Sequence, residues 1–207
     1  MFDLKPVQGS LLATGAPQVP TGLGTVTRID LGHGAWIDWA SDWLPGADEW
    51  LDLMARELPW QQAERPMYER MVEVPRLICS FDSPHDERIP LDLLRLRPVL
   101  EAAYGRSLPR IGANWYRDGN DSVAFHADKV PFPGDSLVVI VAVGERRPFH
   151  LRPRRDPDGR TLEGPTHRFA FGRGDLLVMG GTTQAYFQHG VPKQAGDRTR
   201  VSLMYRD

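Results

Sequence analysis

The sequence predicts an α+β fold in which N-terminal helices precede a jelly-roll core of short strands. Apolar residues recur at helical spacing in two segments before residue 105, and from residue 111 onward they alternate as in strands. Clusters of Gly, Pro and Asp divide the second part into many short pieces, which is typical of a jelly roll. A chain of 207 residues is long enough to bury a substantial core, and we expect one domain over residues 1–207.

The N-terminal part begins with residues 1–25, rich in Gly, Pro and Thr, which predict a loosely ordered lead-in. Residues 27–41 suggest one or two short strands, and residues 45–58 predict an amphipathic helix. The apolar stripe of that helix consists of Trp50, Leu51, Leu53, Met54 and Leu58. A second helix is predicted over residues 91–104, where Pro98 favours a break or kink near Arg97. Its inner stripe consists of Leu93, Leu94, Leu96, Leu100 and Ala103.

Seven strand-like segments follow the second helix. They are IGANWYR (111–117), SVAFHAD (122–128), SLVVIVAV (136–143), RPFHLR (147–152), HRFAFGRGDLLVMG (167–180), QAYFQH (184–189) and TRVSLMYR (199–206). Clusters of Gly, Pro and Asp separate these segments.

The second of these segments carries a His-x-Asp pair, His126 and Asp128. Residues two apart in a strand point to the same face, so an imidazole and a carboxylate converge there. Alone, such a pair is more often a hydrogen-bonded structural contact than a metal site. Two histidines and one carboxylate are nevertheless the ligand set of non-heme Fe(II) oxygenases. Of the other five histidines we choose His189 as third ligand, because a strand that reads as buried leads to it and the arginines of the C-terminal segment follow it.

The C-terminal segment 200–206 alternates, so that Arg200, Ser202, Met204 and Arg206 share one face. These arginines either lie on a solvated sheet surface or grip a carboxylate, which a guanidinium binds through two parallel hydrogen bonds. Asn114 and Tyr116 also share a face, and an amide and a phenol can each hydrogen-bond a carboxylate or keto oxygen.

The order of these residues along the chain resembles that in the AlkB family of Fe(II)- and 2-oxoglutarate-dependent dioxygenases. The resemblance is to the members related to the human nucleic-acid demethylases. The resemblance extends over about residues 58–207. It rests on PWQQ (59–62), PRL (75–77), NWYRDGNDSVAFHAD (114–128), GDLLVMGG (174–181), FQHGVP (187–192) and RVSLMYR (200–206).

The resemblance implies a double-stranded β-helix core in which His126, Asp128 and His189 bind Fe(II). It also implies that 2-oxoglutarate is bound by Asn114, Tyr116, Arg200 and Arg206. Arg200 would pair with the distal carboxylate of 2-oxoglutarate, and Arg206 would lie near the end that chelates iron. The resemblance also divides the domain into three segments. Residues 1–57 would form an N-terminal extension and helix, residues 58–85 a lid over the substrate, and residues 86–207 a helix and the catalytic core.

The substrate side departs from the family pattern. Lys129 and Val130 follow Asp128 where many relatives carry acidic residues, and Ser80 to Asp82 lack one of two expected aromatics. An enzyme that oxidises a base takes it out of the stack and holds it between aromatic side chains. The candidates for this role are Trp60, Tyr68 and Phe81, although core packing is the more common fate of such residues.

Composition and charge limit the binding partners and the cellular compartment that we expect for this protein. The net charge of −2 does not indicate a nucleic-acid binder, but residues 145–160 hold six arginines against three acids and form either a solvated hairpin or a phosphate contact. The sole cysteine, Cys79, excludes an intramolecular disulfide. There is no signal-peptide pattern, and the longest apolar run is too short to span a bilayer. We expect a cytoplasmic monomer without membrane contact.

The expected activity is oxidative demethylation of N-alkylated bases in DNA, of the 1-methyladenine or 3-methylcytosine type, as DNA repair. It would consume 2-oxoglutarate and O2 and release formaldehyde, succinate and CO2. One alternative is an oxygenase of the same fold that acts on RNA, a protein or a small molecule. The other is a non-catalytic, metal-binding jelly roll.

Overall fold

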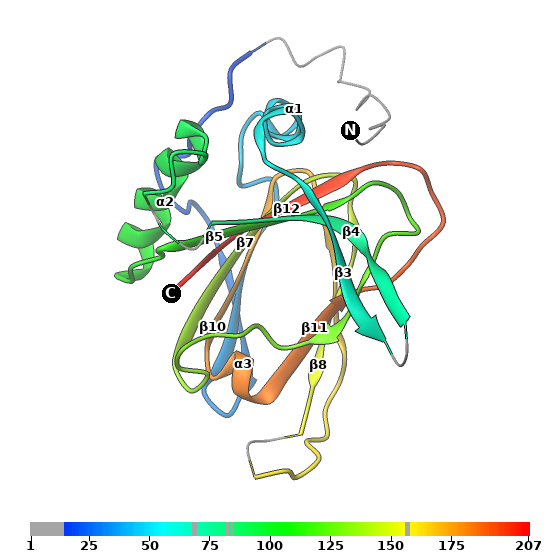
Figure 1. Cartoon of the computed structure of the whole chain (residues 1–207). Helices are drawn as coiled ribbons and strands as arrows, with labels where there is room; N and C mark the ends of the chain where they lie inside the picture. Colours follow the sequence, from blue (N-terminus) through cyan, green and yellow to red (C-terminus); the bar gives the residue numbers. More distant parts are fainter. Residues whose placement is uncertain (1–14, 68–69, 82, 84, 156–157) are drawn as a thin grey trace.

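The computed structural model describes residues 15–67, 70–81, 83, 85–155 and 158–207, and forms two antiparallel sheets with two helices outside the larger one (Figure 1). The eight-stranded sheet has, in spatial order, β1 (Thr27–Gly32), β2 (Ala35–Ala40), β10 (Asp175–Gly181), β7 (Ser136–Gly144), β12 (Arg200–Arg206), β5 (Arg110–Tyr116), β4 (Arg70–Phe81) and β3 (Gln61–Met67). The four-stranded sheet has the order β6 (Val123–His126), β11 (Phe187–Val191), β8 (Arg147–Pro153) and β9 (His167–Phe171). This arrangement confirms the predicted jelly-roll core.

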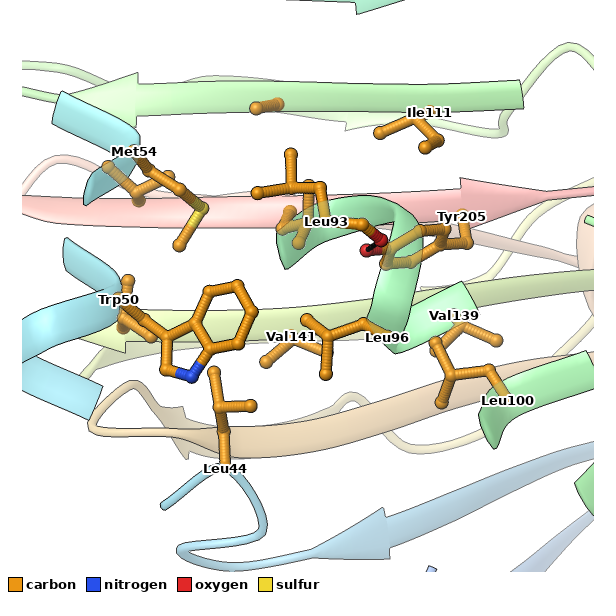
Figure 2. Close-up of a cluster of buried hydrophobic side chains, with 14 of the residues drawn as sticks. Leu44, Trp50, Met54, Leu93, Leu96, Leu100, Ile111, Val139, Val141 and Tyr205 are labelled. Atoms are coloured by element: carbon orange, nitrogen blue, oxygen red, sulfur yellow. Dashed lines mark hydrogen bonds between the residues drawn. The ribbon is translucent and has the colours of Figure 1, made fainter. Parts of the chain in front are cut away.

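One hydrophobic cluster lies between the helices and the large sheet. Helix α1 (Ala47–Glu57) contributes Trp50 and Met54, and helix α2 (Leu91–Tyr104) contributes a leucine stripe (Figure 2). The Tyr205 hydroxyl on β12 donates to the Leu93 carbonyl at 2.7 Å and so ties α2 to the sheet. The helix runs without interruption through Pro98, contrary to the predicted break. Pro98 is exposed, and buried leucines on both sides of it hold the two halves of the helix on the sheet.

A second hydrophobic cluster lies between the two sheets. Strand β7 divides its side chains between the clusters, since Val139 and Val141 face the helices whereas Val138 and Ile140 face the small sheet. Burial on both faces accounts for its continuous apolar sequence. The interface between the sheets is where the candidate functional side chains meet.

Two elements differ from those expected. Strands β3 and β4 pair with each other in an antiparallel manner, extend the large sheet beyond β5 and were not predicted as strands. A short helical turn, α3 (Thr183–Tyr186), takes the first half of the predicted strand 184–189. Within the described residues, no helix is long and apolar enough to cross a membrane.

Candidate active site

The pairing of β6 with β11 brings the two candidate histidines together. His126 is directly opposite His189 in the register, and their ring centroids are 4.3 Å apart. Asp128 lies two residues beyond the end of β6. Its Oδ1 is 3.9 Å from His126 Nε2, and its Oδ2 is 3.7 Å from His189 Nε2. The three residues chosen from the sequence therefore form a group whose ligand atoms all lie within 4.8 Å of one another.

Neighbouring groups orient both imidazoles. His126 Nδ1 lies 3.0 Å from the Ala124 carbonyl, and a proton on Nδ1 leaves Nε2 free to bind a metal. Phe149 stacks on the His189 ring with centroids 5.3 Å apart. Burial lowers the pKa of His189 to about 4, so this imidazole is neutral at pH 7, as a metal ligand must be.

Asp128 is held from two sides and still has one free oxygen. Its backbone N–H donates to Gln184 Oε1 at 2.8 Å, and its Oδ1 accepts from Arg206 Nη2 at 3.0 Å. Oδ2 is buried and has no hydrogen-bond partner among the described residues. Burial opposes its charge, but His189, Arg206 and His126 together hold the pKa of Asp128 below its usual value. An ionised, buried, unpartnered oxygen beside two imidazoles fits a divalent cation.

The candidate 2-oxoglutarate residues lie on β5 and β12, on the face toward the small sheet. The register places Arg200 opposite Tyr116 and Ser202 opposite Asn114, so the residues predicted to share a face do so. Arg200 is 1% exposed, and its Nε donates to the Phe171 carbonyl at 3.0 Å. Its Nη1 is buried without a hydrogen-bond partner among the described residues.

Arg200 has no carboxylate bound to it within the described chain, although its guanidinium is flanked by the Tyr116 and Phe171 rings, each 5.1 Å away. Burial lowers its pKa to about 10, so it remains a cation at pH 7. A buried cation with an unused donor is suited to an incoming carboxylate. These features fit the predicted role in binding the distal end of 2-oxoglutarate.

Sequence reasoning missed three residues around the site. Arg76, in the PRL stretch, donates to Asn114 Oδ1 at 2.9 Å and so orients that amide. Arg147 is buried behind Tyr116 and donates to the carbonyls of Asp118, Gly119, Asp121 and Pro192. Gln184 holds the backbone of Asp128. The PRL resemblance pointed to the region of Arg76, but no local pattern marks the other two.

The aromatic residues suggested for base stacking are not at the site. Phe81 is 1% exposed in the cluster under the helices, so it cannot contact a base without disrupting the core. Trp60 packs against Trp115 with centroids 5.3 Å apart, and its Nε1 donates to the Met54 carbonyl at 3.1 Å. Phe81 is therefore corrected to core packing, and Trp60, which is half-buried, packs against the same cluster. Tyr68 lies outside the described residues.

The arginines of residues 145–160 have separate surroundings. Arg146 pairs with Asp175 and Asp42, and Arg147 is buried. Arg152 lies over the Phe125 ring at 3.7 Å on the outward face of the small sheet. Arg152, Arg154, Arg155 and Arg160 are exposed.

The comparisons with known proteins identify the family of the chain. The family description 2OG-Fe(II) oxygenase superfamily matches residues 80–206. Bovine alpha-ketoglutarate-dependent dioxygenase alkB homolog 3 is 29% identical over 90% of this chain and 67% of its own length. The rat protein of the same name is 30% identical over 90% and 65%. The DNA oxidative demethylase ALKBH2 of Arabidopsis thaliana is 27% identical over 95% and 74%. The chain thus spans about two thirds of the length of the alkB homolog 3 proteins.

Solved structures support the fold. OsALKBH1 superposes with a TM-score of 0.58 at 15% identity, covering 87% of this chain and 100% of that one. An oxidoreductase of the 2OG-Fe(II) oxygenase family from Burkholderia pseudomallei gives a TM-score of 0.52 at 15% identity, covering 85% and 86%. The family match and the alkB homologues confirm the predicted resemblance, and the family match together with the His–Asp–His group supports Fe(II), 2-oxoglutarate and O2 as cofactor and co-substrates. The chain belongs to the 2OG-Fe(II) oxygenase superfamily.

Proposed function

We propose that this protein is a dioxygenase that removes N-methyl groups from bases in DNA. The observation that carries the proposal is that the His–Asp–His group and the buried Arg200 lie in the same interface between the two sheets. Each has one buried polar atom, Asp128 Oδ2 and Arg200 Nη1, that finds no hydrogen-bond partner in the described part of the chain. The names of the relatives, which include a DNA oxidative demethylase, support the substrate class.

In the proposed site His126 Nε2, His189 Nε2 and Asp128 Oδ2 would hold Fe(II). Bound Fe(II), together with 2-oxoglutarate and O2, supplies the oxidation of an N-methyl carbon to a hydroxymethyl group, which leaves as formaldehyde. Arg206 neutralises Asp128 Oδ1, 3.0 Å away, and leaves Oδ2 for the metal. The chain's contribution is to fix three ligands on one side of the metal and to orient the substrate carbon.

Arg200 and Tyr116 would bind the distal carboxylate of 2-oxoglutarate, and Asn114 and Arg206 would lie nearer the metal. This assignment follows the strand register, since Arg200 and Arg206 are at opposite ends of β12 and only Arg206 reaches Asp128. The Arg76 contact keeps Asn114 Oδ1 occupied, so its Nδ2 is the atom available to donate to the co-substrate.

The substrate side is proposed to consist of the lid segment 58–85, which includes the β3–β4 hairpin, and the exposed arginines of the small sheet. The four strands of the small sheet contain no Asp or Glu, whereas Arg152 and Arg168 lie on their outward face. A face that carries arginines and no acidic residues is complementary to phosphates. Such a face would let a protein of net charge −2 bind nucleic acid locally. We propose that a single domain over residues 1–207 acts as a cytoplasmic monomer.

The test is formaldehyde release and base repair on single-stranded oligonucleotides that carry 1-methyladenine or 3-methylcytosine, in DNA and in RNA. We expect one formaldehyde per repaired base in DNA, and no turnover with Asp128→Ala. Turnover on RNA but not DNA would retain the oxygenase and replace the substrate. Succinate formation with neither nucleic acid demethylated would refute the nucleic-acid assignment.

A further inference from the structure

We infer that Gln184, on the short helical turn α3, is a positioning residue that sets the place of the iron ligand Asp128. The inference rests on the proposed role of Asp128 as ligand. It concerns a residue that no sequence motif marks.

The turn α3 is fixed to the rest of the protein on two sides. Thr183 Oγ1 donates to the Gly180 carbonyl at 2.6 Å, and Thr182 Oγ1 donates to the His33 carbonyl at 2.6 Å. On the other side, the Arg154 backbone N–H donates to the Tyr186 carbonyl at 2.9 Å. The turn is therefore joined to the β1–β2 connection and to the end of β8, and its side chains have a rigid base.

Gln184 points from this base toward the metal ligands. It is 2% exposed, and its Oε1 accepts from the Asp128 backbone N–H at 2.8 Å. Within the part of the chain that the structure describes, its Nε2 donates to the Met179 thioether, a weak acceptor 3.7 Å away. The amide is thus oriented with its strong acceptor toward Asp128.

Asp128 needs such a support because the sheet does not provide one. The last residue of β6 with a strand partner is His126, opposite His189, so the backbone of Asp128 lies outside the ladder. Gln184 holds its backbone and Arg206 holds its Oδ1, at 2.8 and 3.0 Å. With both held, Oδ2 is the oxygen left facing His189. Groups that orient a metal ligand in this way typically change metal affinity about 10- to 100-fold when removed.

The experiment compares variants that keep volume and differ in the acceptor. Gln184→Met fills the same space without an acceptor, whereas Gln184→Glu presents an acceptor oxygen at the same reach. Mn(II), which does not turn over, is titrated into the metal-free protein by calorimetry, and the melting temperature of each metal-free variant is recorded. Gln188→Met is the matched control, since Gln188 lies on the neighbouring strand β11 and its amide faces Arg152.

We expect Gln184→Met to weaken Mn(II) binding about 10- to 100-fold, while Gln184→Glu and Gln188→Met bind as tightly as the unmodified protein. Unchanged affinity in Gln184→Met, or an equal loss in Gln184→Glu, would overturn the inference. If Gln184→Met does not fold, Gln184→Asn replaces it, because its shorter side chain withdraws the acceptor from Asp128 and the same loss is expected. Asp128→Ala distinguishes a failure of this inference from a failure of the proposed metal site: if Asp128→Ala also binds Mn(II) normally, the proposed metal site itself is wrong.

Discussion

Replacing Arg200 by methionine should stabilise the protein and at the same time weaken 2-oxoglutarate binding. Methionine keeps much of the apolar stem but removes a charge that is buried without a carboxylate in the described structure. The two effects have opposite signs because the buried charge destabilises the ligand-free protein but strengthens the binding of a carboxylate.

The stability change follows from the burial of the guanidinium. The fall in its pKa from 12.5 to about 10, caused by burial, corresponds to about 3 kcal/mol against the charged form. The substitution also removes the hydrogen bond to the Phe171 carbonyl, which contributes about 1 kcal/mol. We therefore expect the free energy of unfolding of the ligand-free protein to rise by about 2 kcal/mol, measured by urea denaturation.

The affinity change has the other sign. Removing one partner of a buried ion pair costs about 3–5 kcal/mol, which corresponds to a dissociation constant about 100-fold to a few thousand-fold higher. Calorimetry with 2-oxoglutarate and the Mn(II)-loaded protein measures this change. Unchanged affinity, or a loss of stability in the ligand-free variant, would refute the account of Arg200.

Arg147 is the matched control for this substitution, because it is equally buried beside Tyr116 but already has acceptors. Its guanidinium donates to four backbone carbonyls of the segments 118–121 and 192. Arg147→Met leaves these carbonyls unsatisfied, so we expect a loss of at least about 3 kcal/mol in stability. Equal stability changes in both variants would show that burial alone determines the effect.

Three further predictions concern His189, Trp60 and Cys79. The metal-free protein should lose stability as the pH falls from about 6.5 to about 4. Burial lowers the pKa of His189 to about 4, so in this range the unfolded chain binds a proton at His189 and the folded protein does not. Urea denaturation over this pH range should show a weaker pH dependence for His189→Leu than for the native chain. Trp60→Phe should cost about 1 kcal/mol through loss of the bond to the Met54 carbonyl and leave kcat/KM for repair unchanged, whereas a fall in kcat/KM would restore Trp60 as a base contact. Burial raises the pKa of Cys79 to about 12, so iodoacetamide should alkylate it only after unfolding, and rapid labelling of the native protein would contradict its burial.

The metal ligands and the arginines were accessible from the sequence because each depends on local periodicity. Strand alternation placed Arg200 and Arg206 on one face, and the register of β12 agrees. It also placed His126 beside Asp128, whose Oδ1 is 3.9 Å from His126 Nε2 although Asp128 lies beyond the end of β6. Such alternation follows a rule with period two, which a single sequence displays. His189 was instead chosen because a buried strand leads to it and because the segment after it carries the arginines.

What the sequence did not reveal depends on long-range contacts. Gln184 acts on a residue 56 positions earlier, and Arg147 on carbonyls up to 45 positions away. Trp60 and Phe81 were misplaced because an aromatic residue in or beside a strand does not indicate which face of the sheet it occupies until the neighbouring layer is known. The helices cover that face here, and both side chains pack beneath them.

The most direct test of the central claim is whether 2-oxoglutarate binding requires the metal held by Asp128. Calorimetric titration of 2-oxoglutarate into the protein, with and without Mn(II), measures this requirement. We expect binding to the Mn(II)-loaded protein, little binding without metal, and no metal-dependent gain in Asp128→Ala. Binding of equal strength in all three samples would contradict a site in which metal and co-substrate are held together between the two sheets.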